Sequence, residues 1–128
     1  MQIERRTMLG GAIAAVGAAG VAQAQESPAM HGLIGKMTAR PGQRDALITI
    51  LLEGVSGMPG CLSYIVAQDP RDADAIWITE VWDTAASHRA SLSLPSVQAA
   101  IAKGRPLIAG MEAGTQTVVV GGHGLVKS

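Results

Sequence analysis

The chain has 128 residues, ten basic and ten acidic side chains, and a formal net charge of zero. Its length fits one domain, and the lack of a basic excess argues against a nucleic-acid partner, because binding to phosphates requires a basic surface. Hydrophobic residues make up 48% of the sequence, yet Phe and Asn are absent and the only aromatic residues are Tyr64, Trp77 and Trp82, so an aliphatic core is expected.

Residues 1–24 predict an export signal. Arg5 and Arg6 precede an uncharged stretch rich in Ala and Gly, which ends at the small-x-small cleavage site Ala22-Gln23-Ala24. Weak hydrophobicity behind paired arginines favours the twin-arginine route, and a Sec signal that contains two arginines is the alternative. Residues 25–30 would form a short polar leader. We therefore expect a periplasmic or secreted protein with no stable membrane insertion after cleavage.

The next two predicted elements are a strand and an amphipathic helix. His31–Ala39 alternates side chains in the period-two pattern of a strand. Arg40-Pro41-Gly42 ends this strand, and its proline favours the start of a helix. The helix is predicted over Gln43–Ser56, where apolar residues recur with the spacing of one helical face: Leu47, Ile50, Leu51 and Val55.

Two strands follow. Cys61–Gln68 is an apolar stretch, and Ala75–Trp82 is dense in β-branched and aromatic residues, which favour strands. Asp69–Asp74 lies between them and is rich in turn-forming residues. Cys61 has no second cysteine in the chain to pair with, so it is predicted to be buried as a small apolar residue, with an intermolecular disulfide as the alternative.

A second, broken helix and a last strand complete the domain. Asp83 or Thr84 would cap a short helix that ends at Leu92. After a glycine-rich break, Thr115–Val120 is predicted as the last strand. Between them a helix begins at Pro95, and its predicted apolar face consists of Val97, Ala100, Ile101, Gly104 and Ile108.

The order β-α-β-β-α-β, with its second helix split, predicts an α+β fold of the ferredoxin-like kind, with an antiparallel sheet and helices on one face. Residues 31–120 would form this domain and residues 121–128 a flexible tail. Helices can cover only one sheet face, and an uncovered face is normally polar. The strand Ala75–Trp82 is apolar on both faces, so we expect a homodimer packed sheet to sheet: Ile76, Ile78 and Trp82 lie on one face, Trp77 and Val81 on the other.

Several motifs together carry a family resemblance that covers nearly all of His31–Val120. They are Arg40-Pro41-Gly42, Gly57-Met58-Pro59-Gly60-Cys61-Leu62-Ser63-Tyr64, Glu80-Val81-Trp82, the helical His88, and Ser91-Leu92. In these motifs the chain resembles the antibiotic biosynthesis monooxygenase family, a group of dimeric α/β-barrel proteins. The resemblance implies oxidation of quinols, naphthols and related aromatics with O₂, without metal, flavin or haem. Because the chain has no Asn, it lacks the Asn-Trp-His set of the haem-degrading relatives and the pocket Asn of the quinone-forming ones.

The resemblance implies a simple chemistry. A phenol loses a proton, the resulting anion reduces O₂ in a closed pocket, and the caged pair recombines on carbon. His88 is the candidate proton acceptor, since imidazole changes charge near neutral pH; a half-exposed histidine without a catalytic role is the alternative. Glu80 lies on an apolar strand face, where a charge needs a partner. It is either a base or the partner of Arg89 or Arg105.

Three further residues are candidates for substrate binding. Trp82 would form an aromatic wall or pack in the core. Tyr64 would direct its hydroxyl at a bound oxygen or lie in the dimer interface. His31, at the start of the first strand, would lie at the pocket mouth or be solvated. No metal site is expected, because His31, His88 and His123 are far apart and no cluster has ligand spacing.

The sequence therefore leads to one function and one alternative. The first is an exported, cofactor-independent monooxygenase that oxidises a quinol or another small phenolic with O₂. The alternative is a non-catalytic dimeric barrel that binds a small apolar ligand. The two share a fold and a pocket, so the sequence does not separate them.

Overall fold

The structure, a computed structural model, describes residues 29–125. The predicted signal of residues 1–24, most of the predicted leader and residues 126–128 of the predicted tail lie outside this range. The described elements are, in chain order, β1 (Met30–Ala39), α2 (Arg44–Gly54), β2 (Cys61–Gln68), β3 (Ala75–Trp82), α3 (Ala85–Ser91), α4 (Pro95–Gly104), a 3₁₀ turn (Arg105–Leu107), β4 (Ile108–Met111) and β5 (Thr115–Val119).

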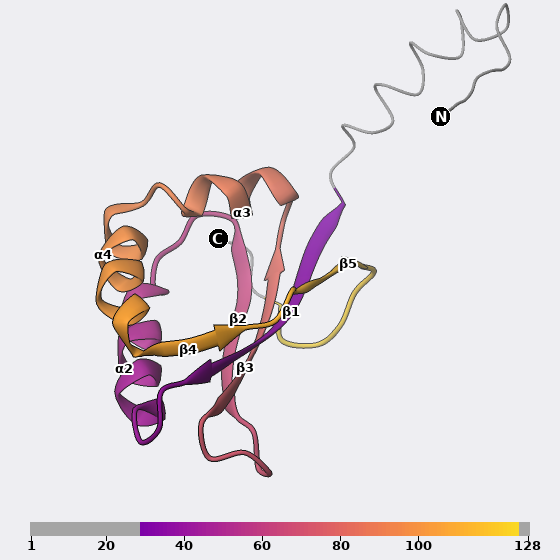
Figure 1. Ribbon diagram of the computed structural model, residues 1–128. Coiled ribbons are helices and arrows are strands. Elements are labelled where there is room, and N and C mark those ends of the chain that lie inside the picture. The colour runs from indigo at the N-terminus through magenta and orange to yellow at the C-terminus, as the bar shows by residue number, and fades with distance from the viewer. Residues whose placement is uncertain (1–28, 126–128) are drawn as a thin grey trace, which may run out of the picture.

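The strands form one antiparallel sheet with the order β2-β3-β1-β4, and β5 pairs with the same edge of β1 as β4 does. The helices gather on one side of this sheet (Figure 1). The predicted α+β, ferredoxin-like fold is thus confirmed. The register places His31 of β1 opposite Trp82 of β3, and Tyr64 of β2 opposite Glu80 of β3. These pairs bring the candidate site residues to one end of the sheet.

The core lies between the sheet and α2. Leu47 of α2 packs with Met37, Ala39, Ile76 and Ile78 of the two central strands, and all five are buried. Helices α2 and α4 approach closely at Gly54, where an added Cβ would lie 2.5 Å from the Cβ of Ala100. A larger residue at position 54 would push the two helices apart, and both helices line the cavity described below.

The last part of the chain differs from the prediction. Ile108 was expected on the apolar face of the second helix, but α4 ends at Gly104 and Ile108 begins β4. Pro106 cannot continue an α-helix, and the chain turns there through the 3₁₀ turn. The predicted last strand corresponds to β5, and an unpredicted strand, β4, precedes it along the same edge of β1. Between the two, the backbone N–H of Glu112 donates to the carbonyl of Lys36 at 3.0 Å.

The start of α3 is fixed by its cap and by a glycine. Thr84, and not Asp83, caps the helix: its Oγ1 accepts a hydrogen bond from the backbone N–H of Ser87 at 3.1 Å. Gly60 has a φ of 83°, and an added Cβ there would lie 2.5 Å from Ser87 Oγ. Only glycine fits this close approach. The contact holds α3 against the start of β2 and so sets the position of His88.

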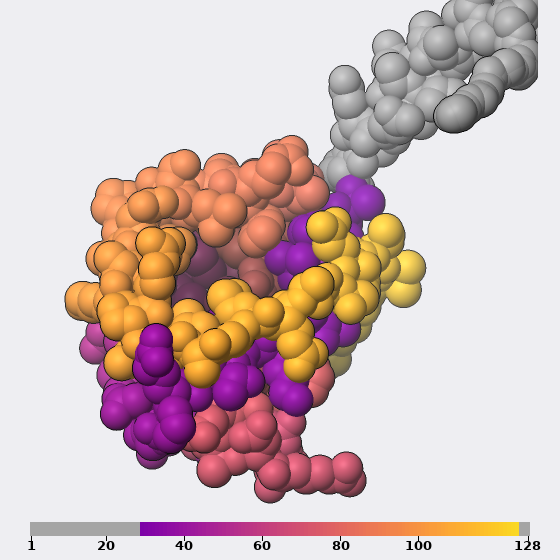
Figure 2. All heavy atoms as spheres, viewed as in Figure 1, coloured from indigo at the N-terminus to yellow at the C-terminus, as the bar shows by residue number. Residues whose placement is uncertain are grey.

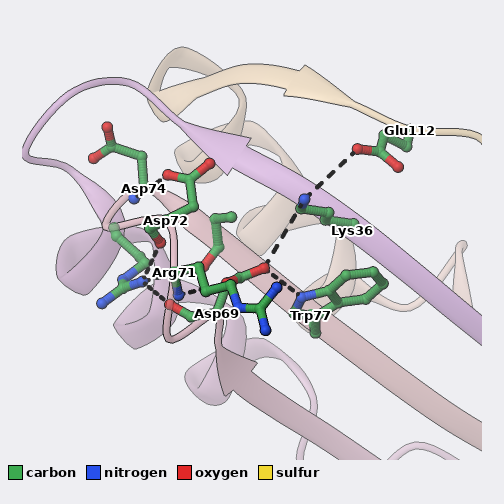
Figure 3. Close-up of polar contacts among 9 residues, drawn as sticks. Lys36, Asp69, Arg71, Asp72, Asp74, Trp77 and Glu112 are labelled. Atoms are coloured by element: carbon green, nitrogen blue, oxygen red, sulfur yellow. Dashed lines mark hydrogen bonds and ion pairs between the residues drawn. The ribbon is translucent and has the colours of Figure 1, made fainter.

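The outer face of the sheet, opposite the helices, carries a polar network around Trp77 (Figure 3). The indole Nε1 of Trp77 donates to Asp69 Oδ2 at 2.8 Å, and Lys36 Nζ lies 5.3 Å from the ring centroid. Lys36 Nζ is also 3.9 Å from a carboxylate oxygen of Asp69 and of Glu112. Exposed apolar residues of neighbouring strands surround this network, among them Ile34 and Ile65. None of the helices in residues 29–125 is long and apolar enough to cross a membrane.

Candidate functional site

A cavity of about 600 Å³ lies between the inner face of the sheet and the helices. In Figure 2 it is visible as a hollow between the atoms of α4 and those of β4. Aliphatic side chains of β1, α2, β3 and α4 form most of its wall, including Leu33, Leu51, Ile78 and Val97. A pocket of this size and character suits an apolar molecule of one or a few rings.

Polar groups enter this cavity mainly at one end. Tyr64 of β2, Glu80 and Trp82 of β3, and His88 of α3 all line it. They are four of the five residues that the sequence singled out. The fifth, His31, is not among the lining residues and lies behind His88, with 5.8 Å between the two ring centroids.

Glu80 is held by its strand neighbour. Side chains two residues apart on a strand point to the same face, and Trp82 Nε1 donates to Glu80 Oε1 at 2.8 Å. His88 Nε2 lies 3.9 Å from the same oxygen. The expected pairing with Arg89 or Arg105 is wrong, because within residues 29–125 the polar partners of Glu80 are an indole and an imidazole.

His88 contacts two rings. The ring of Trp82 has its centroid 5.5 Å away with an interplanar angle of 60°, and the ring of His31 is tilted by 34° to the imidazole. Ser91 is buried and its Oγ donates to the backbone carbonyl of His88 at 2.6 Å, which stabilises the last turn of the short helix. The imidazole is therefore held at the cavity wall with one edge toward Glu80.

Tyr64 lines the cavity, which is one of the two positions that the sequence left open. Burial, together with the negative charge of Glu80 opposite it in the register, raises the pKa of the Tyr64 hydroxyl well above its usual value. Tyr64 therefore stays protonated at neutral pH. Its hydroxyl can donate a hydrogen bond to an oxygen of a bound molecule.

Cys61 is half-buried at the start of β2. Burial is the main reason why the pKa of its thiol is raised; a backbone hydrogen bond with Ser63 opposes the effect, and the negative charge of Glu80 adds to it. The thiolate is thus disfavoured, which agrees with the role of a small apolar residue. Residues 29–125 contain no group of three or more His, Cys, Asp or Glu side chains that could hold a metal ion.

Sequence reasoning missed the cavity mouth. Arg105, Met111 and Glu112 line the cavity, but two of them lie in or next to β4, which was not predicted. The sequence also did not predict that Ser91 supports the helix that carries His88. The hydroxyl sits three residues after His88, a spacing that places it on the same helix face and was the available clue.

Known proteins share this fold, and one of those compared also shares much of this sequence. The family model described as antibiotic biosynthesis monooxygenase matches residues 30–103. A candidate antibiotic biosynthesis monooxygenase from Chloroflexus aurantiacus J-10-fl, known from a crystal structure, is 74% identical, with a TM-score of 0.74, over 75% of this chain and 98% of its own. Comparison with curated proteins gives no match.

More distant structures share the fold alone. A candidate monooxygenase of the same description from Caulobacter crescentus CB15 is 16% identical, with a TM-score of 0.68, over 79% of this chain and 99% of its own. A conserved protein from Methanosarcina mazei Go1 is 12% identical, with a TM-score of 0.64, over 74% of this chain and 97% of its own. The family model covers more than half of the chain, so this protein belongs to the antibiotic biosynthesis monooxygenase family.

Proposed function

We propose that the protein is a cofactor-independent monooxygenase that oxidises a quinol or another small phenolic with O₂. The observation that carries this proposal is the convergence of a carboxylate, an imidazole and a neutral phenol hydroxyl at one end of an otherwise apolar cavity. A phenolic ring fits the apolar wall, and its oxygen meets the polar groups. Family membership supports the same class of reaction.

A hydroquinone suits this chemistry because it supplies all the electrons that O₂ needs. One oxygen atom bonds to a ring carbon in place of hydrogen, and the other takes up two hydrogens and leaves as water. The product is the hydroxyquinone. A phenol or naphthol also balances with O₂ alone: one oxygen atom replaces a ring hydrogen, the other leaves as water, and the product is the quinone.

Each polar group has a defined part in this reaction. His88 accepts the phenolic proton, and Glu80, 3.9 Å from its Nε2, stabilises the positive charge that then forms on the imidazole. Tyr64 donates a hydrogen bond to the oxygen that loses this proton. Trp82 holds the Glu80 carboxylate in place and provides a flat wall for the substrate.

The decisive experiment follows O₂ uptake by metal-free, flavin-free protein with a panel of hydroquinones and naphthols, after subtraction of autoxidation. We expect turnover that falls about 10²- to 10⁴-fold in His88→Ala, as for loss of an acid–base group. His123→Ala is the matched control, because His123 is exposed and lies outside the cavity. Thermal unfolding of both variants should match that of the wild type.

The alternative function has its own outcome in this experiment. If the protein binds these aromatics without O₂ uptake, and His88→Ala changes affinity only, the protein is a binding module rather than an enzyme. Saturable quenching of Trp82 fluorescence would measure such binding. Uptake that is equal in His88→Ala and wild type would contradict the assignment of His88 as the base.

We also propose that the protein is a homodimer in which two sheets pack through their outer faces. The support is the set of exposed apolar side chains on that face, including Ile34, Ile65 and Trp77. Sedimentation equilibrium at micromolar concentration should give a dimer, and Ile65→Lys should give a monomer. A monomeric wild type would contradict this arrangement.

Export is the third part of the proposal. The paired arginines and the Ala22-Gln23-Ala24 site support cleavage after Ala24 and a periplasmic or secreted location. N-terminal sequencing of the protein from the periplasmic fraction should begin at Gln25. Substitution of both Arg5 and Arg6 by Lys should block export if the twin-arginine route is used, and a Sec signal would tolerate it.

A further inference from the structure

The mouth of the cavity is surrounded by large apolar side chains that face solvent. Leu92 after α3, Ile101 of α4 and Met111 of β4 all line the cavity, and their exposed fractions are 46%, 37% and 67%. They come from three separate segments of the chain and line the same cavity, whose hollow is visible in Figure 2. We call these three residues the apolar rim. A cluster of exposed apolar side chains around an opening normally marks a contact surface.

Three basic residues lie near this rim along the chain. Arg105 lines the cavity itself, Arg89 precedes Leu92 by three residues, and Lys103 follows Ile101 by two in the last turn of α4. All three are exposed, and within residues 29–125 none of them forms an ion pair. The acidic residue at the rim, Glu112, is paired with Lys36. The surroundings of the opening are therefore apolar with an uncompensated positive charge.

We propose that the apolar rim and its flanking basic residues dock the protein on an anionic lipid surface, with the cavity mouth facing the lipid. Apolar side chains surrounded by Lys and Arg are the combination that binds peripheral proteins to such surfaces. A second copy of the chain would present the same positive charges and so would be repelled. Charge complementarity thus favours anionic lipid as the occupant.

Docking in this orientation extends the proposed function and rests on it for its substrate. A quinol or phenol dissolved in the lipid would pass from the bilayer into the apolar cavity without crossing water. Its ring would reach Glu80 and His88, and a long apolar tail could remain in the lipid. The substrate class that this geometry fits is therefore a lipid-dissolved quinol.

The test is co-sedimentation of residues 25–128 with vesicles. The predicted signal is omitted because its apolar stretch would bind lipid by itself. Residues 25–128 contain the whole of the described fold, and the Chloroflexus relative, 98% of which aligns with 75% of this chain, has a similar fold in its crystal structure. We expect binding to vesicles of mixed phosphatidylglycerol and phosphatidylcholine, weaker binding to phosphatidylcholine alone, and a loss on the order of 10-fold or more in the triple variant Leu92→Ser, Ile101→Ser, Met111→Ser.

Leu52→Ser is the matched control. Leu52 is an exposed leucine of α2, 54% accessible, that does not line the cavity. Its replacement should leave vesicle binding unchanged. Arg89→Gln combined with Lys103→Gln should reduce binding to the anionic vesicles and its salt dependence, without affecting binding to phosphatidylcholine. No binding by wild type, or equal loss in Leu52→Ser and the rim variant, would overturn the proposal.

Activity measurements separate this inference from the proposed function. Turnover of a water-soluble hydroquinone without vesicles tests the function alone. If that turnover is present and vesicle binding is absent, only the docking proposal fails. If vesicles bind but neither soluble nor vesicle-embedded hydroquinone is oxidised, the proposed function fails together with the lipid-dissolved substrate, and the docking surface stands. A change in the sedimentation mass of the rim variant, with unchanged vesicle binding, would show that the rim joins two copies of the chain instead.

Discussion

The two tryptophans of β3 make the same hydrogen bond in two different places. Trp77 on the outer face donates its indole N–H to Asp69, and Trp82 on the inner face donates to Glu80, both at 2.8 Å. The exposed fraction is 37% for Trp77 and 1% for Trp82. One strand thus carries an indole–carboxylate pair on each face of the sheet, and only the surroundings distinguish them.

The difference lies in what else the carboxylate touches. Asp69 accepts from Trp77 and from the backbone N–H of Arg71, and it faces Lys36, so its oxygens are satisfied within the fold (Figure 3). Glu80 has its Oε1 near Trp82 and His88, and no described residue donates to its Oε2. A carboxylate whose oxygens all have partners within the fold stabilises a turn. A carboxylate in a cavity with one oxygen lacking a described donor is available to a ligand.

The largest expected effect concerns stability. Trp82→Ala should lower the free energy of unfolding by about 3–5 kcal/mol, because it removes a fully buried ring. In the monomer, Trp77→Ala should cost only about 1–2 kcal/mol, since the ring is partly exposed and loses one hydrogen bond. Urea unfolding of both variants at pH 7, at protein concentrations below and above dimer formation, measures the difference. A loss for Trp77→Ala that grows with protein concentration toward that of Trp82→Ala is the result that the proposed homodimer requires.

Measurements of activity should distinguish the two carboxylates, because only Glu80 lies in the cavity. Glu80→Gln keeps an oxygen for Trp82 but removes the charge near His88, so kcat/KM for a hydroquinone should fall about 10- to 100-fold. Asp69→Asn, the control on the outer face, should change it less than about twofold. The melting temperature of Glu80→Gln should stay close to that of wild type. A comparable drop in kcat/KM for both variants would remove the distinction between the two sites.

Much of the fold followed from local patterns. Cys61–Gln68 and Ala75–Trp82 were predicted with the bounds that the structure has, because glycines, prolines and a run of aspartates delimit them. Ile108 was misassigned because it continues the spacing of the α4 apolar face by coincidence. Pro106 was the stronger local signal, since proline ends a helix whatever the periodicity around it.

The site was predictable residue by residue but not in its contacts. The alternation along β3 places Glu80 and Trp82 on one face, so their pairing could be inferred from the sequence. The contact between His31 and His88 depends on the register that sets His31 opposite Trp82, and no local pattern encodes that register. The same holds for the apolar rim, which gathers residues from three elements.

Alkaline titration tests the inner pair further. Tyr64 is the only tyrosine, so phenolate absorbance reports on it alone. Its pKa is raised in the folded protein, mainly by burial and next by Glu80, so the unfolded chain ionises first, near pH ~10. Stability is then complete below that pH and falls by about 1.4 kcal/mol per pH unit above it. Tyr64→Phe should lack this fall. Phenolate absorbance near pH 10 from folded wild type would contradict the burial.

The smallest expected effect is on the outer pair, at acid pH. The backbone N–H of Arg71, then the indole of Trp77, and then the charge of Lys36 hold the pKa of Asp69 below its usual value. Because the pKa is depressed, the contribution of this carboxylate to stability is present above pH ~4 and is lost as the pH falls below it. Asp69→Asn should therefore be less stable than wild type at pH 6 and equal to it at pH 2, as measured by urea unfolding. A difference that persists at pH 2 would mean that the turn geometry, and not the charge, depends on Asp69. In that case Asp69 would stabilise the fold through the hydrogen bonds of the turn and not through its negative charge.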